Sequence, residues 1–457
     1  MKRVVLVNPP IVTQRGDVTG TGTPYWPIPL AIIAAILDKR YEVKIFDMYG
    51  RNPKRKIVDG ELILHGIPIE VANLSIKSGD TVVIYSGHVI AHTTVLKLIE
   101  RINLSKPKKV IVVENTNFVN AYPLDRFYED FKRLGAIIIA GDPYGVIRKA
   151  IDGNYDSKGR HQFMRVDSLP MPKWDGFPLE NYWGLSYAHA PKTSDKYIQM
   201  YTSFGCNGMC NFCTNPYINK SRWRPKSAEK VFEEIMFWYD RGIGEFHIED
   251  LNPTIDKKRI KDLCQKIIDR GVFLKLKIAS GTKIETLDEE TLLWMHDAGF
   301  DYLSFSPESG SKRVLGLMNK KFDHEYALKL INFINSFRFI NPMITQACFI
   351  LGYPGETDDD IALTVDYVYK LVKAGVDEFA FFNFVPSVGA AVSEGFNVKT
   401  DDMTFSSDWR PYNKKLRIMR LKWIMEIYMI KGVFHPIRTV TRFFRTKIWM
   451  TVKRVFL

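Results

Sequence analysis

Short apolar runs alternate with longer stretches of helical periodicity along the first third of this 457-residue chain. The runs at residues 3–8, 41–47 and 81–87 are bounded by proline, glycine or polar residues, which is typical of strands buried on both faces. Helical stretches such as IPLAIIAAILDKR and TTVLKLIERI separate them. Strand and helix in alternation predict a doubly wound, Rossmann-like parallel sheet over residues 1–150.

Ligands bind to such sheets beyond the carboxyl ends of the strands. The residues that the pattern places at those ends are small or polar, and we take them as candidate binding residues. They are Asn8, Ser86, Gly87, Asn115 with Asn117, and Gly141 with Asp142.

A different composition follows at residues 151–195, where glycine, proline and aromatic residues occur without sustained periodicity. We interpret this segment as a linker between domains. Alternation resumes over residues 196–395 with six strand–helix units, which predict a partial or complete parallel βα barrel with its active site at the carboxyl ends of the strands. The predicted fold class is therefore α/β, with residues 396–457 as a basic helical tail.

Three of the five cysteines, Cys206, Cys210 and Cys213, lie in one loop directly after the first barrel strand, with the spacing C-x3-C-x2-C. A structural zinc site needs four ligands. A redox pair of the last two cysteines is a second reading, but it leaves the first without a role. Three thiolates can instead hold three irons of a cubane cluster and leave the fourth iron open. Cys264 and Cys348 lie in apolar patterns, as small core residues do.

The residues around these cysteines suit a cluster loop. Gly205 and Gly208 allow the backbone to turn tightly, and Phe204 and Phe212 can shelter a cluster from water. An odd number of cysteines in so long a chain also fits a reducing compartment better than a disulfide scaffold.

The segment TSFGCNGMCNFCTNP resembles the signature of the radical S-adenosylmethionine (SAM) enzymes. IGEFHIEDLNPT, LSFSPESGS and FILGYPGET resemble, in order, the segments that follow the second, fourth and fifth strands of that family's barrel. The resemblance implies a [4Fe-4S] cluster on the three loop cysteines, and reductive cleavage of SAM to a 5′-deoxyadenosyl radical. It also implies cofactor contacts, beside the cluster, from Glu249, Asp250, Ser280, Glu308, Ser309 and Gly352. Phe212, next to the cysteines, is a further candidate cofactor contact.

The first domain and the linker resemble those of a large subgroup with a cobalamin-binding domain before the barrel. This subgroup includes radical methyltransferases and the magnesium-protoporphyrin ester cyclase family. Two of its motifs differ here, because residues 114–117 read ENTN and residues 141–144 read GDPY. A D-x-H-x-x-G motif is also absent from the sequence. A degenerate domain without cobalamin is therefore an alternative, and His88 after the strand at 81–87 is a weak candidate ligand.

The net charge of +13 is concentrated in the tail. Residues 411–457 contain twelve lysines and arginines against one glutamate, interleaved with bulky apolar residues, and predict two helices broken near Gly432 and Pro436. Three readings stay open for these helices: contact with an anionic membrane, packing on the barrel, and RNA binding. We expect a cytoplasmic protein, with peripheral contact at the inner membrane face under the first reading.

These features predict a radical SAM enzyme that carries out cobalamin-dependent methyl transfer or rearrangement on a small molecule or lipid, with an electron donor such as flavodoxin or ferredoxin. The alternative is an RNA-modifying enzyme of the methylthiotransferase type. Those enzymes carry three further cysteines before the barrel, whereas residues 1–205 contain none. A zinc or scaffold protein is disfavoured by the number of ligands.

Overall fold

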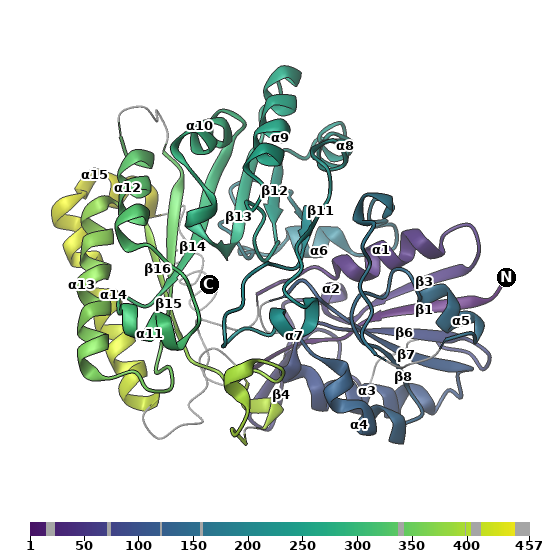
Figure 1. The fold of residues 1–457 in the computed structure, drawn as a ribbon. Helices are drawn as coiled ribbons and strands as arrows, with labels where there is room; N and C mark the ends of the chain where they lie inside the picture. Colours follow the sequence, from purple (N-terminus) through teal and green to yellow (C-terminus); the bar gives the residue numbers. More distant parts are fainter. Residues whose placement is uncertain are drawn as a thin grey trace.

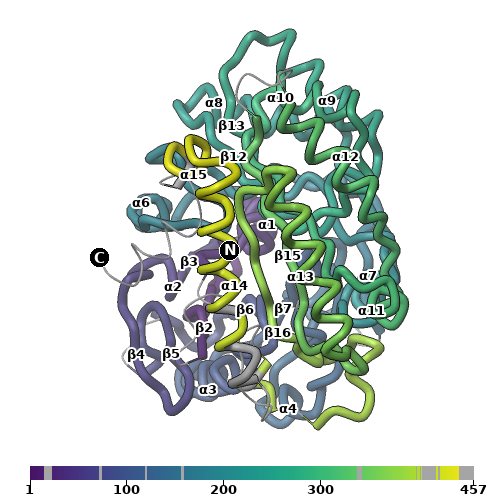
Figure 2. Tube along the Cα trace, turned by 90° about the vertical axis from the view of Figure 1, so that its left-hand side faces the viewer, coloured from purple at the N-terminus to yellow at the C-terminus, as the bar shows by residue number. Residues whose placement is uncertain are grey.

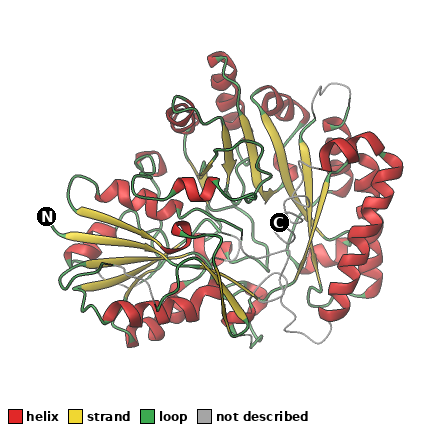
Figure 3. Ribbon diagram, turned by 180° about the vertical axis from the view of Figure 1, so that it is seen from behind, coloured by secondary structure: helices red, strands yellow, loops and turns green. Residues whose placement is uncertain are grey.

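The computed structural model describes residues 1–14, 23–70, 75–118, 121–155, 159–336, 342–397, 399–403 and 413–443. Two parallel sheets, each flanked by helices, lie next to each other in the fold (Figure 1). Seen from behind, the loops that leave the two sheets meet between them (Figure 3). The α/β class predicted from the sequence is confirmed.

The first sheet has five parallel strands in the order β3-β1-β6-β7-β8, as predicted for a doubly wound domain. Its core strands are almost wholly apolar because helices cover both faces. The strands are β1 (Arg3–Asn8), β3 (Glu42–Asp47), β6 (Thr81–Ser86), β7 (Lys109–Glu114) and β8 (Ile137–Ile139), and the main helices are α1 (Ile28–Leu37) and α3 (His92–Asn103). A small antiparallel sheet of β2 (Ile11–Gln14), β4 (Lys56–Asp59) and β5 (Leu62–His65) lies beside them.

The second sheet has six parallel strands in the order β16-β15-β14-β13-β12-β9, so it is an open, partial barrel. Its strands are β9 (Ile198–Met200), β12 (Glu245–Ile248), β13 (Lys275–Thr282), β14 (Phe300–Glu308), β15 (Ile344–Leu351) and β16 (Glu378–Asn383). The covering helices are α8 (Ala228–Tyr239), α9 (Lys257–Arg270), α10 (Glu289–Asp297), α12 (His324–Ile334) and α13 (Asp358–Ala374).

Side-chain caps fix where these helices begin. The residue before each helix accepts a hydrogen bond from a backbone N–H of the first turn, which satisfies a donor that the helix itself leaves unpaired. These caps are Ser227, Asp256, Asp288, Asp323 and Thr357.

The segment predicted as a linker does more than join the domains. It forms α6 (Leu179–Trp183), and then Ala190 packs against Ala279, Tyr302 and Ile344 on the strand faces that point away from the covering helices. The inward face of the barrel is therefore partly filled by residues that precede its first strand.

The tail forms two helices, α14 (Asn413–Phe434) and α15 (Pro436–Phe443), with the break at Pro436. Figure 2 shows α14 running beside α13 and β16. Trp423 packs edge-to-face on Phe381, and both carboxylate oxygens of Asp377 accept from Arg438, at 2.7 and 2.8 Å. The part of the predicted helical tail after residue 443 lies outside the described residues. No helix in the described ranges is long and apolar enough to cross a bilayer.

Candidate active site

The cysteine loop joins β10 (Ser203–Phe204) to α7 (Asn215–Asn219) at the carboxyl end of β9. Gly205 has a φ of +75°, and a Cβ there would lie 2.2 Å from the carbonyl oxygen of Arg222, so the turn requires glycine. Backbone N–H groups donate to the sulfurs: Gly208 to Cys206 at 3.3 Å, and Asn215 to Cys213 at 3.4 Å.

The three thiols lie close enough together to influence one another. Burial, and next the neighbouring Cys210, raise the pKa of Cys213 to about 12. Burial also raises the pKa of Cys210, while the nearby Lys320 and Lys283 oppose this rise. Buried thiols with N–H donors and flanking lysines suit thiolate ligands, because both groups stabilise negative sulfur.

No three histidine, cysteine or acidic side chains of the described residues come close enough to share a single metal ion. A cubane cluster spreads its ligands over several irons, so the trio of cysteines suits a cluster better than one zinc ion.

Glu308 ends β14 beside the cysteine loop. It has a φ of +66°, and Lys320 donates to its carboxylate at 2.9 Å, with both side chains almost fully buried. Burial alone would lower the pKa of Lys320, but Glu308 and Cys210 raise it. This pair places a charged lysine next to the thiols. Ser309, in contrast, points to α13 and shares a hydrogen bond with Thr364.

The acidic pair after β12 divides between two environments. Asp250 accepts from the backbone and hydroxyl of Thr202 and from the hydroxyl of Ser203, at 2.6–2.7 Å, so it braces the strand that leads into the cysteine loop. Glu249 instead accepts from His189, a residue of the linker that the sequence did not single out. No sequence pattern marks His189, because its partner is 60 residues away.

The other predicted barrel residues also end strands. Ser280 is partly exposed near the end of β13, and Gly352 follows β15 with a φ of +73° and donates to Glu356 at 2.6 Å. Phe212 packs on a small apolar cluster that includes Tyr353. Asn252, which the sequence analysis missed, is buried after β12, and its amide nitrogen has no partner among the described residues.

The strand ends of the first domain fall into two groups. Asn8 and Ser86 lie at the ends of β1 and β6. Asn8 donates to Asp47, whereas the buried hydroxyl of Ser86 has no partner within the described ranges. Asn115 donates to the hydroxyls of Tyr85 and Tyr201, so it already bridges to the barrel.

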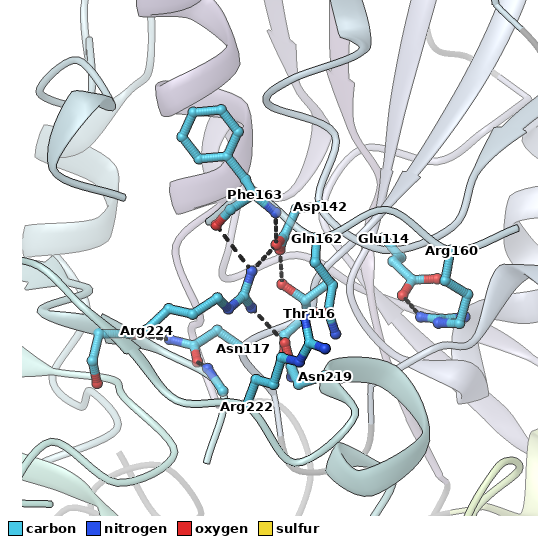
Figure 4. Close-up of polar contacts among 12 residues, drawn as sticks. Glu114, Thr116, Asn117, Asp142, Arg160, Gln162, Phe163, Asn219, Arg222 and Arg224 are labelled. Carbon is cyan, nitrogen blue, oxygen red and sulfur yellow. Dashed lines mark hydrogen bonds and ion pairs between the residues drawn. The ribbon is translucent and has the colours of Figure 1, made fainter. Parts of the chain in front are cut away.

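A polar network then joins the remaining strand ends to the cysteine loop (Figure 4). We call Thr116, Asn117, Asp142, Asn219 and Arg224 the interdomain network. Asn117 donates to the carbonyl of Ser203 at 3.0 Å and accepts from Gly205 at 3.1 Å.

Arg224 forms an ion pair with Asp142, which also accepts from Thr116 at 2.5 Å. Arg224 and Asn219 lie on the barrel side of the network, and Asn219 donates to the carbonyl of Thr116 at 2.7 Å. The residues that depart from the subgroup's motifs therefore hold the cysteine loop against the first domain.

Gly141 belongs to the same edge. It has a φ of +85°, and a Cβ there would lie 2.1 Å from the carbonyl oxygen of His161. A second buried ion pair joins Glu114 to Arg160 nearby (Figure 4). The edge from Asn115 to Asp142 is thus filled by protein contacts.

Comparison with known proteins identifies the superfamily of the barrel. Residues 200–368 match the model of the radical SAM superfamily, and this range contains the cysteine loop and four complete barrel strands, β12 to β15. The barrel belongs to the radical SAM superfamily. The chain is therefore an enzyme with a [4Fe-4S] cluster and SAM as cofactors, as predicted.

The similarity to other proteins also extends beyond the radical SAM barrel. The chain is 26% identical over 445 residues to cytidylyl-2-hydroxyethylphosphonate methyltransferase of Streptomyces wedmorensis, a match covering 85% of this chain and 80% of that protein. It is 24% identical to an uncharacterized methyltransferase of Pyrococcus horikoshii, over 92% and 88% of the two chains. The structure of the radical SAM methyltransferase TsrM from Kitasatospora setae, with cobalamin and a [4Fe-4S] cluster bound, has the same fold, with a TM-score of 0.59, 14% identity, and coverage of 86% and 78%.

Proposed function

We propose that this radical SAM enzyme is a methyltransferase that acts on a small molecule, with cobalamin held between its two domains. The observation that carries the proposal is the joining of both domains at the cysteine loop, where Asn117 of the first domain binds Ser203 and Gly205. A first domain built onto the cluster loop can present a second cofactor to the same substrate. Methyltransferases among the full-length relatives support this assignment.

Unsatisfied or partly exposed groups favour one side of the strand ends as the cobalamin site. Protein contacts fill the edge from Asn115 to Asp142, as described above. On the other side, the buried hydroxyl of Ser86 lacks a partner in the described ranges, and Gly87 and His88 are partly exposed. An unpaired buried hydroxyl is costly unless a ligand or water completes it. We therefore place cobalamin against Ser86, Gly87 and His88, where it would supply a transferable methyl group when bound.

Side chains around the cysteine loop favour binding of the cluster. Lys320, held by Glu308, lies next to the thiols and favours their charged form. The phenyl ring of Phe212 and its apolar neighbours limit water near the loop. One electron must come from outside, and a reductant such as flavodoxin or ferredoxin fits this need.

The proposal is tested by anaerobic reconstitution with iron, sulfide and hydroxocobalamin, followed by desalting and optical spectra. The wild-type protein should retain cobalamin and release deoxyadenosine. Gly87→Leu should lose cobalamin but keep its iron, because the new side chain would occupy the proposed site; its Cβ would lie 3.2 Å from the ring of Tyr85. Gly432→Leu is the matched control, since a Cβ there meets nothing within 4 Å. Equal cobalamin retention by Gly87→Leu and the control would contradict the proposed site.

We further propose that the tail contacts an anionic membrane surface. The outer face of α14 and α15 is apolar: seven large side chains there are 52–77% exposed, namely Ile418, Met425, Met429, Val433, Phe434, Ile437 and Val440. Soluble proteins seldom expose so continuous an apolar stripe. After Glu426 the sequence carries no acidic residue and seven lysines and arginines. Lys431 and Arg438 bind Asp377, and the charge of the other five complements anionic lipid.

Vesicle flotation tests this contact. Vesicles with phosphatidylglycerol should bind the protein more strongly than neutral ones, and less at high salt. Met425→Glu with Met429→Glu should abolish binding, whereas Phe273→Glu, at a side chain 90% exposed on the barrel, should not. Light scattering that shows a dimer dissociated by the methionine changes would instead assign the stripe to a second copy of the chain.

A further inference from the structure

A small group of side chains inside the barrel is not used by the cluster or by the interdomain network. Glu249 ends β12, and one of its carboxylate oxygens accepts from Nδ1 of His189 at 2.5 Å. The other oxygen is buried and has no partner among the described residues. Ala190, the residue after His189, packs inside the barrel, so the linker holds His189 next to Glu249.

Aromatic rings from the first domain face this pair. The ring of Tyr25 lies 4.9 Å from that of His189 and 4.7 Å from that of Phe118. His88 in turn lies 4.0 Å from Phe118. Three segments far apart in sequence thus form one wall opposite Glu249.

The wall is uncharged. Burial first, and the Glu249 carboxylate second, raise the pKa of Tyr25 well above its usual range, so its phenol keeps its proton. Burial lowers the pKa of His88 to about 4, so its imidazole is neutral at physiological pH.

The side chains around the Glu249 carboxylate are partly exposed, although its free oxygen is buried. The side chain of His189 is 18% exposed although protein surrounds it, and Tyr25 and His88 are partly exposed too. Partly exposed aromatic side chains beside one unsatisfied carboxylate oxygen are the usual lining of a small-molecule site.

We infer that Glu249 and His189 form the polar end of the substrate pocket, where a hydroxyl or protonated amine of an unsaturated small molecule donates to the free oxygen of Glu249. This inference rests on the proposed function, because it places the substrate between the radical SAM barrel and the first domain. A buried carboxylate oxygen without a donor is costly, so a ligand that supplies one gains affinity. His189 acts as a positioning residue, since its hydrogen bond fixes the orientation of the carboxylate.

Glu249 is thereby assigned to the substrate and not to SAM. The sequence suggested that Glu249 contacts SAM, together with Asp250. Its neighbours here are His189 and the aromatic wall, whereas Glu308 is the acid that affects the loop thiol of Cys210. Glu249 should therefore influence substrate affinity and not SAM affinity.

Three matched probes test the pocket on the reconstituted protein: phenethylamine, 2-phenylethanol and propylbenzene, which have the same number of heavy atoms and differ in the terminal group alone. Ligand-observed NMR and calorimetry should show the amine and the alcohol binding about tenfold or more tighter than the hydrocarbon, as expected for a hydrogen bond to a charged group. In Glu249→Gln the preference for the amine should disappear, while SAM affinity stays unchanged. Glu325→Gln, on the outer helix α12, is the control and should leave both unchanged.

Several outcomes would overturn the inference. They are equal binding of all three probes to the wild type, no binding of the amine or the alcohol at millimolar concentration, an unaltered preference in Glu249→Gln, or a loss of SAM affinity in that variant. A second variant covers the role of His189. His189→Asn retains a donor near Nδ1 and should keep much of the preference, whereas His189→Ala should reduce it. Because these measurements involve no methyl transfer, failure of the proposed reaction would leave their outcome readable.

Discussion

The ion pair between Arg224 and Asp142 offers the sharpest test of how the two domains are joined. Its side chains are only 3% and 1% exposed, and Arg224 also donates to Asn219 at 2.6 Å. In Arg224→Met the aspartate would remain buried with its negative charge uncompensated. Removing one partner of such a pair costs about 3–5 kcal/mol.

The matched control is Lys258→Met, which breaks a pair with Asp262 on the surface of α9. Those side chains are 82% and 47% exposed, so the expected cost is about 0–1 kcal/mol. Anaerobic urea unfolding followed by circular dichroism gives both values. Amide exchange at Gly205, whose N–H donates to Asn117, should also accelerate in Arg224→Met alone, because that bond belongs to the same network.

A double variant tests whether the lost stability comes from the uncompensated charge of Asp142. Arg224→Met with Asp142→Leu should recover much of the stability lost in the single variant, since no buried charge remains. A loss below about 1 kcal/mol in Arg224→Met, with unchanged exchange at Gly205, would refute the view that this network holds the cysteine loop.

Three further changes have defined outcomes. Cys213→Ser should lower the iron content of the reconstituted protein severalfold, measured by a colorimetric iron assay, since two thiolates cannot hold the cluster. Gly141→Ala should destabilise the fold by more than about 2 kcal/mol in urea, because its Cβ would collide with His161, whereas Gly60→Ala, in open space at a φ of +62°, should cost about 1 kcal/mol. Burial raises the pKa of Glu356 from 4.5 to about 7. The contribution of this carboxyl group to the stability of the fold is therefore complete below pH 4.5 and is lost as pH rises through 7. Glu356→Gln should flatten the pH dependence of the melting temperature over this range.

Local patterns predicted the elements well. Apolar runs marked the strands because these strands are buried on both faces. Helix starts are local as well, since Ser227 and Asp256 each accept from a backbone N–H only three residues further on. The cysteine trio was equally visible because its spacing is local. The membership of the barrel in the radical SAM superfamily followed from these features.

Contacts between distant segments were not predictable in the same way. Arg224 and Asp142 are 82 residues apart, and no periodicity links them. The linker lacks regular patterning, so its insertion into the barrel, and with it the position of His189, depends on packing that only the folded chain defines. The same reason explains why the sequence predicted a cofactor contact for Asp250 but not its hydrogen bonds from Thr202 and Ser203.

The most direct test of the account is the cluster itself. After anaerobic reconstitution, iron analysis with electron paramagnetic resonance of the reduced protein should give about four irons per chain and a signal that changes when SAM is added, because one iron lacks a protein ligand. A signal unaffected by SAM, or a full complement of iron in Cys213→Ser, would contradict the claim that these three cysteines hold an open cluster.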